Sequence, residues 1–501
     1  MFTDASSALG KPLTSAGELI GHVHLIVLLA ALLLHGGCAA GTGAPMTPAT
    51  NDYDLVIANG RVMDPESGLD AVRNLGIRDG VIRSISSGAL SGDTVLDAEG
   101  LVVAPGFIDL DTYARLARFH VADGVTTVVN FREGTADVDD WYAQYEGEMP
   151  VHYGVAIGFQ ELRVEIIGEA EPAPDADPRV YDKDKLEQIL TRIDHGLQRG
   201  AIGVGVGGAK FRAPSNRELL ETFTVAASHD APVSATLRDV LWADEDIAPV
   251  LTEWLGAAAL TGVSLHIPHL SSSAGPYTRR MLELIEQARA HGLDVTTENY
   301  PYTGSINSLI YVGDELLQWS DKELEDILLI AENRPITRED IPIYRERDPA
   351  MVFMNSAIAP DVDAAIINPL TSIATHGWID DQLRGHPRTS GTYSKILGRY
   401  VRERQQLSLM DALRKMSLMP AQRLEQRVPA MRNKGRIKLG ADADIVVFDP
   451  DRVIDRSTFA APTLPPEGIH HVWVSGVPVL KDGVIQENVH PGQPVRAPIR
   501  K

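Results

Sequence analysis

Residues 105–113 read Pro105-Gly106-Phe107-Ile108-Asp109-Leu110-Asp111-Thr112-Tyr113. This stretch predicts a short, largely buried strand. Side chains alternate between the two faces of a strand, so Asp109, Asp111 and Tyr113 lie on the same face. The strand therefore presents two carboxyl groups and a phenol together.

Downstream of this strand, apolar strand-like runs alternate with helical patterns. Helices are predicted at 186–199, 219–228 and 279–291. Eight such alternations over roughly 270 residues favour a closed (β/α)₈ TIM barrel, assigned to residues 105–430, over an open sheet. Its functional groups are expected at the C-terminal strand ends. The predicted strands lie near 106–111, 125–131, 152–159, 201–206, 232–237, 263–270, 293–300 and 371–376.

Both ends of the chain have a β-rich pattern. Segments 54–62 and 74–82 read as short strands that contain Asn-Gly and Asp-Gly, which are strong hairpin signals. Segments 440–449 and 471–476 have a similar texture. We therefore predict one small β-sandwich domain built from residues 53–104 and 431–490, followed by a tail at 491–501.

The composition is that of a soluble globular protein that does not bind polyanions. The chain has 501 residues, of which 44% are hydrophobic and 23% charged. It carries 46 basic and 68 acidic residues, a formal net charge of −22. Phosphate contacts require concentrated Lys and Arg, so nucleic acid is not an expected partner.

The leader contains the only cysteine of the chain, Cys38, directly after an apolar run at 23–34. That run is too short to span a bilayer comfortably, but it fits the core of a signal peptide. We predict a signal peptide at residues 1–38 and a linker at 39–52, with export to the periplasm. Residues 34–38 resemble a lipobox, which makes Cys38 a lipidation site; the alternative is a plain secretory signal with an incidental cysteine.

Many segments resemble, in the same order, one family of barrel proteins. They are 54–59, 104–110, 123–127, 134–138, 292–298, 300–303, 385–388, 397–403, 418–421, 434–436 and 440–444. Together they resemble the amidohydrolase superfamily, in its N-acyl-D-amino-acid deacylase branch with the D-glutamate deacylase-like members. The resemblance implies hydrolysis of an amide by metal-activated water, with an aspartate of the last strand as general base.

The metal ligands implied by this resemblance are mostly substituted. Strand one has Asp111 and Tyr113 in place of His-x-His, and strand two places Asn130 or Arg132 near an expected bridging carboxylate. Strand five has Thr236 where a histidine is expected, and strand eight has His376 where the catalytic aspartate is expected. Strand six keeps its expected ligand, His269. The ordinary dinuclear zinc site is therefore not expected to form.

Strands one and eight are neighbours in a closed barrel, which puts Asp111 beside His376. One hypothesis is that Asp111, His269 and His376 hold a single divalent metal, zinc in the first place, with Asp111 and His376 also catalytic. The alternative is a hydrogen-bonded pair in a site without metal. The protein would then be a pseudoenzyme that acts as a periplasmic binding or scaffold protein.

A small molecule with a carboxylate is the expected substrate or ligand. Arg388, Tyr300 and Arg238 are the candidate residues to bind it, because arginine offers bidentate geometry to a carboxylate. The alternative role of these residues is to support loops. His266 is expected to be a packed, hydrogen-bonded histidine, and Lys210 a loop cation.

The leader generates a prediction about the membrane. If Cys38 is the lipidated N-terminus of the mature protein, the expressed protein fractionates with membranes, and Cys38→Ala releases it into the soluble fraction. Mass spectrometry of the mature N-terminus provides the control. Cleavage at another position, with unchanged fractionation of the variant, would contradict this prediction.

Overall fold

Eight parallel strands form the central sheet, paired in the order in which they occur along the chain. The computed structural model describes residues 52–168, 182–207, 215–237, 248–346, 351–355 and 357–500. The predicted TIM barrel is confirmed. Its strands are β6 (Phe107–Asp109), β7 (Val125–Thr135), β8 (His152–Gly158), β9 (Val204–Val206), β10 (Val233–Ala235), β11 (Leu265–Ile267), β12 (Val295–Asn299) and β17 (Thr371–Ile373).

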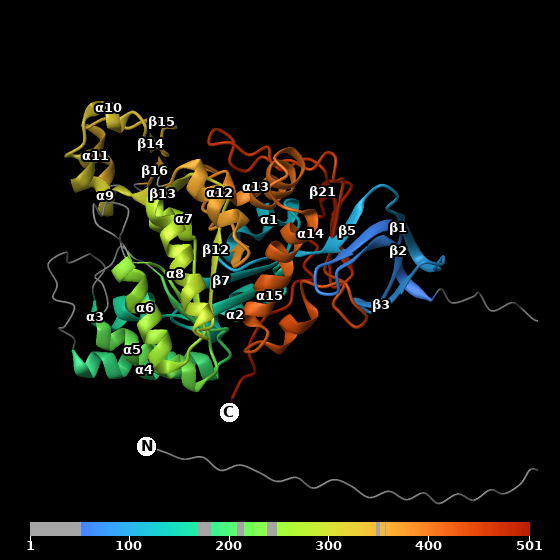
Figure 1. The fold of residues 1–501 in the computed structure, drawn as a ribbon, viewed down its shortest axis with the longest axis horizontal. Coiled ribbons are helices and arrows are strands. Elements are labelled where there is room, and N and C mark those ends of the chain that lie inside the picture. The colour runs from blue at the N-terminus through green and yellow to red at the C-terminus, as the bar shows by residue number, and fades with distance from the viewer. Residues whose placement is uncertain are drawn as a thin grey trace, which may run out of the picture. The chain divides into compact units, whose positions relative to one another are not determined.

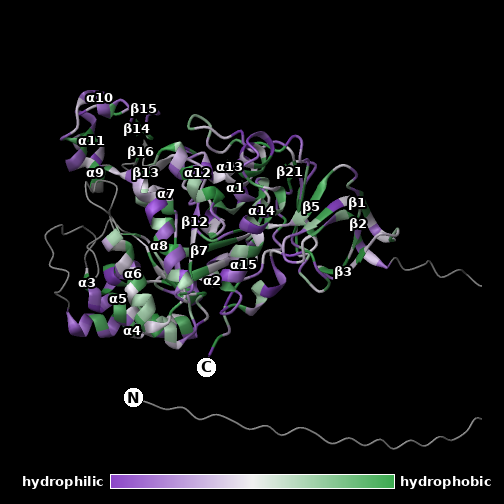
Figure 2. Ribbon diagram, in the orientation of Figure 1, coloured by the Kyte–Doolittle hydropathy of each residue, from purple (hydrophilic) through white to green (hydrophobic). Residues whose placement is uncertain are grey.

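The helices between these strands have one apolar face. In α4 (Lys183–Gln198), the buried residues Leu186, Ile189, Ile193 and Leu197 recur at the three- and four-residue spacing of one helix face. Figure 2 shows hydrophobic and hydrophilic residues on both α4 and α8 (Thr278–Ala290), as this pattern requires. The other helices near the barrel are α1 (Ala117–Ala122), α2 (Val138–Tyr145), α3 (Phe159–Ile167), α5 (Asn216–Ser228), α6 (Ala248–Thr261), α7 (Leu270–Ala274), α12 (Ala359–Ile367), α13 (Arg388–Lys395), α14 (Leu409–Leu413) and α15 (Met419–Leu424). Short 3₁₀ segments η1 (Ala114–Leu116), η2 (Gly275–Tyr277) and η5 (Pro429–Asn433) and π segments η3 (Ile396–Glu403) and η4 (Arg414–Leu418) complete them.

Side chains join β6 and β17, the two ends of the strand order. The Asp109 carboxylate accepts from the Thr375 amide at 3.1 Å and from the Thr375 hydroxyl at 2.6 Å. The Tyr393 hydroxyl reaches the carbonyl oxygens of Ile108 and Ile373, at 3.2 and 3.4 Å. These bonds fix the ends of β6 and β17 side by side.

The predicted β domain built from both chain ends is confirmed. β5 pairs in parallel with β1 and antiparallel with β18, which joins the N-terminal strands to the C-terminal ones. Figure 1 shows β1, β2 and β3 together beside β5. The strands are β1 (Tyr53–Asp64), β2 (Leu69–Arg78), β3 (Val81–Ser86), β4 (Gly92–Asp97), β5 (Val102–Pro105), β18 (Ile445–Phe448), β19 (Ile469–Val474), β20 (Val477–Lys481) and β21 (Val484–Ile485).

An additional small unit, not identified from the sequence, separates β12 from β17. It consists of β13 (Gly304–Ser308), β14 (Leu328–Leu329), β15 (Arg334–Pro335), β16 (Met351–Asn355), α9 (Leu309–Leu316), α10 (Asp321–Leu324) and α11 (Asp340–Arg345). Leu309, Leu316, Leu329 and Ile341 belong to its own hydrophobic core. Figure 1 shows these elements grouped at the upper left. The unit begins just after the C-terminal end of β12, the end at which functional groups are expected.

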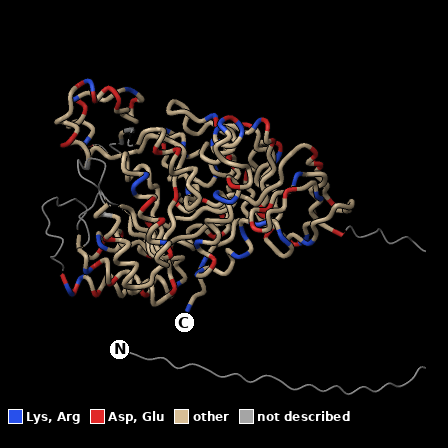
Figure 3. Tube along the Cα trace, in the orientation of Figure 1, with Lys and Arg blue, Asp and Glu red and all other residues tan. Residues whose placement is uncertain are grey.

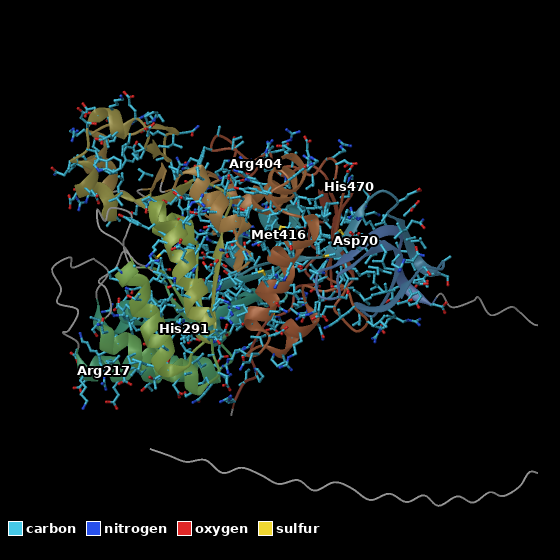
Figure 4. All side chains as sticks on the ribbon, in the orientation of Figure 1. Asp70, Arg217, His291, Arg404, Met416 and His470 are labelled. Carbon is cyan, nitrogen blue, oxygen red and sulfur yellow. The ribbon has the colours of Figure 1, made fainter. Side chains whose placement is uncertain are left out.

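The described surface is polar and mixed in charge. Figure 3 shows Lys and Arg interspersed with Asp and Glu. In Figure 4, Met416 lies among buried residues, whereas the side chains of Asp70 and Arg404 are exposed. None of the helices in the described ranges has the length and apolar content required to cross a membrane.

A buried ion cluster connects β8 to the β domain. Lys434 Nζ lies 2.9 Å from Asp442 and 2.8 Å from Asp444. His152, on β8, contacts the other Asp444 oxygen at 3.0 Å. Burial raises the pKa of the Asp444 carboxyl, but His152 and Lys434 outweigh this effect and lower the pKa below its usual range. Asp444 therefore depends on its cationic partner.

Lys434→Met is expected to destabilise the fold by about 3–5 kcal/mol, because it leaves the buried Asp444 carboxylate with His152 and without its permanent cation. Lys438→Met is the control, since Lys438 pairs with Glu66 on the surface and its loss costs at most about 1 kcal/mol.

The folded pKa of Asp444 lies below its unfolded value of about 3.9. The contribution of Asp444 to the free energy of unfolding is therefore present above that pH and is lost as the pH falls. Urea unfolding at several pH values measures both effects, and equal losses in the two variants would contradict the assignment.

Candidate metal centre

Three potential ligands from three strand ends converge in the structure. Asp111 follows β6, His269 follows β11 and His376 follows β17. One ligand atom from each lies within 4.8 Å of those of the other two. The two imidazole ring centres are 4.4 Å apart. The residues that the sequence analysis grouped as a two-histidine, one-carboxylate set are therefore neighbours at the C-terminal strand ends.

Both histidines have unusual backbone conformations. His269 has φ of 37° and His376 has φ of 48°, in the left-handed region that residues other than glycine rarely adopt. Such strain costs on the order of 1–3 kcal/mol and is typical of functional sites. The fold maintains this strain at the two positions where the imidazoles meet.

The carboxylate of Asp111 fixes the orientation of His376. Asp111 Oδ2 lies 2.7 Å from His376 Nδ1, and Asp111 Oδ1 accepts from Arg132 Nε at 2.9 Å. Burial raises the pKa of the Asp111 carboxyl, but His376 and Arg132 outweigh it and lower the pKa well below its usual range. Asp111 is therefore ionised and accepts a hydrogen bond from His376 Nδ1, which fixes the orientation of the imidazole.

Two serine hydroxyls contact the same ring nitrogen of His269. Ser272 Oγ donates to the His269 carbonyl at 2.9 Å and also lies 3.2 Å from His269 Nδ1. Ser273 Oγ is 2.9 Å from the same nitrogen. The two hydroxyls therefore hold the His269 ring through Nδ1.

This donor set fits a divalent metal. Burial lowers the pKa of His376 to about 4 and that of His269 well below its usual value, so both imidazoles are neutral near pH 7, the form that binds metals. Each Asp111 carboxylate oxygen accepts one hydrogen bond and keeps a second lone pair that can bind a metal. Two imidazole nitrogens and one carboxylate with an open position suit zinc and related ions. The His376 side chain is 21% exposed, which leaves access to the set.

Tyr113, Arg132 and Glu133 form a second polar group beside Asp111. Tyr113 donates to Glu133 Oε2 at 2.5 Å, and Arg132 Nη1 lies 2.8 Å from Glu133 Oε1. The sequence left open whether Asn130 or Arg132 lies here, and the structure places Arg132. Asn130 instead bonds with the backbone of Glu133 and Gly134.

Glu133 was missed in the sequence analysis. Strict strand alternation puts residues 132 and 133 on opposite faces, but an irregularity between Asn130 and Thr135 in β7 breaks the alternation. The Asn-x-x-x-Gly spacing of residues 130–134 is the only signal that could have revealed it.

The remaining residues from the sequence analysis lie outside the three-residue set. Thr236 is buried near the end of β10. His266 bonds to Thr296 at 2.8 Å and lies 3.1 Å from Glu298, as a packed histidine does. Arg238, Lys210 and Cys38 lie outside the described residues.

Arg388 is a buried cation beside the metal ligands. Its side chain is about 1% exposed, its Nε donates to the His376 carbonyl at 2.6 Å, and its guanidinium lies 4.3 Å from the centre of the Tyr300 ring. Nη1 has no hydrogen-bond partner among the described residues, and none of their carboxylates forms an ion pair with Arg388. Burial lowers its pKa. A buried guanidinium without a counter-charge is costly, and a carboxylate ligand would compensate it.

A cavity elsewhere in the protein contains none of these groups. It has a volume of about 360 Å³ and lies between α1, the end of α2 and residues 485–490. The donor geometry, rather than the size of a cavity, locates the candidate site.

Comparison with known proteins agrees with the fold and the position of the site. The model of the Amidohydrolase family matches residues 357–480. The N-acyl-D-glutamate deacylase of Alcaligenes xylosoxydans xylosoxydans is 28% identical over 85% of this chain and 93% of its own length. A solved N-acyl-D-glutamate deacylase from Bordetella bronchiseptica, complexed with zinc and a phosphonate inhibitor, is 25% identical, with a TM-score of 0.76 over 89% of this chain and 100% of its own. A D-aminoacylase structure, from work on the function of its binuclear metal centre, has the same identity and coverage and a TM-score of 0.74.

The structure combines a parallel eight-stranded barrel with a β domain built from both chain ends, and it places potential ligands at the C-terminal strand ends. Together these features define an amidohydrolase scaffold. In sequence and in fold the chain is similar to the amidohydrolases, in particular to N-acyl-D-amino-acid deacylases.

The site predicts one tightly bound divalent ion per chain. Asp111→Asn, His269→Ala and His376→Ala are each expected to weaken zinc binding more than about 100-fold, because loss of even an outer-shell partner costs 10- to 100-fold. His291→Ala, on the surface and labelled in Figure 4, is the control and should bind zinc normally. Calorimetric titration of the metal-free proteins measures the affinities. Wild-type affinity in the three site variants would rule out this ligand set.

Proposed function

We propose that the protein is a metal-dependent hydrolase that removes the acyl group from N-acyl amino acids, with zinc as its single metal. One observation carries this proposal: the buried guanidinium of Arg388, whose Nη1 has no hydrogen-bond partner among the described residues, lies directly beside the three potential ligands. A substrate with a carboxylate and an amide would place its charge against Arg388 and its amide near the ligands. The similar proteins whose names refer to N-acyl-D-glutamate deacylase and D-aminoacylase support this reaction and a D-configured substrate.

Asp111, His269 and His376 would hold the metal. When bound there, the metal polarises the amide carbonyl and lowers the pKa of water. The work on D-aminoacylase that describes activation by one metal and attenuation by a second supports activity with a single ion.

The residues of the chain orient the reactants and neutralise charge. Arg388 binds the substrate carboxylate, and the Tyr300 ring supports the guanidinium from one face. The Asp111 carboxylate accepts a hydrogen bond from His376 Nδ1 and so orients this imidazole beside His269. His376 therefore occupies the strand-eight position of the family's aspartate with a carboxylate partner from strand one.

A panel of N-acetyl-D- and L-amino acids, with their carboxamide analogues, tests the proposal. The zinc-loaded wild type is expected to hydrolyse members of the carboxylate series, and a chelator should abolish turnover. Arg388→Met should lower kcat/KM by about 10- to 150-fold for the carboxylates, the value of a charge-assisted hydrogen bond, but not for the carboxamides. Arg388→Lys, which keeps the charge, is the matched variant and should retain part of the preference.

Metal content must be measured for each variant, because Arg388 also bonds to the His376 backbone. Wild-type protein without bound metal and without turnover would end the enzyme proposal and favour a binding or scaffold role. Equal losses on both substrate series, at normal metal content, would remove Arg388 as the carboxylate anchor.

A further inference from the structure

Arg132 lies between two carboxylates at the edge of the candidate metal centre. Its Nε donates to Asp111 Oδ1 at 2.9 Å, and its Nη1 lies 2.8 Å from Glu133 Oε1. Nη2 donates to the Tyr113 hydroxyl at 3.4 Å. The Arg132 side chain is 9% exposed. Three oxygen atoms therefore surround one buried guanidinium.

A cation stabilises the charges here: Asp111 is buried, and Glu133 is 39% exposed. Asp111 and Glu133 contribute two negative charges, and burial raises the pKa of Tyr113, which stays a neutral phenol. Arginine stays protonated in proteins, so Arg132 supplies one permanent positive charge. Without Arg132, Asp111 would keep His376 as a partner, whereas Glu133 would keep only the Tyr113 hydroxyl.

Two carboxylate oxygens and a phenol oxygen around one point are also ligands for a hard divalent cation. We propose that Arg132 is a built-in cation that occupies the place of a second metal ion and limits the centre to one ion. This inference rests on the proposed single-metal hydrolase. It assigns to Arg132 a positioning role: the guanidinium orients Asp111 toward His376 and neutralises Glu133 without taking part in a reaction step.

The inference predicts that removal of the guanidinium creates a second cation site. Arg132→Met leaves Asp111, Glu133 and Tyr113 facing a space of about the size of the lost group. Arg132→Gln, which keeps an amide donor, is a second neutral variant in case Arg132→Met folds poorly. Arg132→Lys keeps the charge and should keep the site at one ion. The double variant Arg132→Met/Glu133→Gln removes a carboxylate from the new site and should return to one ion.

Arg436 provides a matched control. It is also a buried arginine between two carboxylates, Glu66 and Glu425, but it lies at the β domain away from the three ligands. Arg436→Met should leave the metal content of the protein unchanged. If it gains an ion as well, the gain in Arg132→Met is a general consequence of unpaired carboxylates.

Elemental analysis and titration of each metal-free, folded protein with zinc and with manganese measure the stoichiometry, and circular dichroism verifies the fold. The expected result is one ion in the wild type and two in the neutral Arg132 variants. Two ions in the wild type, or one ion in both folded neutral variants, would overturn the role of Arg132. A wild type that binds none, with a neutral variant that binds one, would support Arg132 as the excluding cation but reject the proposed function. No binding in any protein would reject both.

Discussion

The contact between Asp111 and His376 is the interaction on which the site depends. It crosses from β6 to β17, the two ends of the strand order, where Asp109 and Thr375 already hold the strands together. One carboxylate thereby fixes an imidazole on the neighbouring strand end. The geometry of the barrel and the chemistry of the site are consequently linked: a change in the seam between these strands would change the orientation of the His376 imidazole.

Charge balance explains why so many ionisable groups are buried around this contact. Asp111 has His376 and Arg132 as partners, Glu133 has Arg132 and Tyr113, and each of these contacts is a hydrogen bond or an ion pair. Arg388 differs, because its guanidinium has no carboxylate partner in the described part of the chain. This buried cation without a paired carboxylate indicates where a ligand can supply a negative charge.

The sequence predicted the fold well and the site in part. Strand alternation and the order of strands in a closed barrel predict that Asp111 and His376 are neighbours, because both depend only on backbone periodicity. Glu133 was not predictable in this way, since a local irregularity in β7 turns it toward Tyr113. The orientation of the His269 ring depends on the Ser272 and Ser273 hydroxyls, and the left-handed backbone at His269 has no sequence signal. The unit between β12 and β17 was missed because its short strands pair mainly with each other and interrupt the barrel pattern.

The coordination of zinc in the intact wild-type protein tests the central claim most directly. X-ray absorption at the zinc edge of protein loaded with one equivalent reports the type and number of ligands. We expect a shell of nitrogen and oxygen atoms with the scattering of two imidazoles, at about 2.0–2.1 Å, and no second metal nearby. A shell without two imidazoles, or a metal–metal distance of about 3.5–4 Å, would contradict a single ion held by Asp111, His269 and His376.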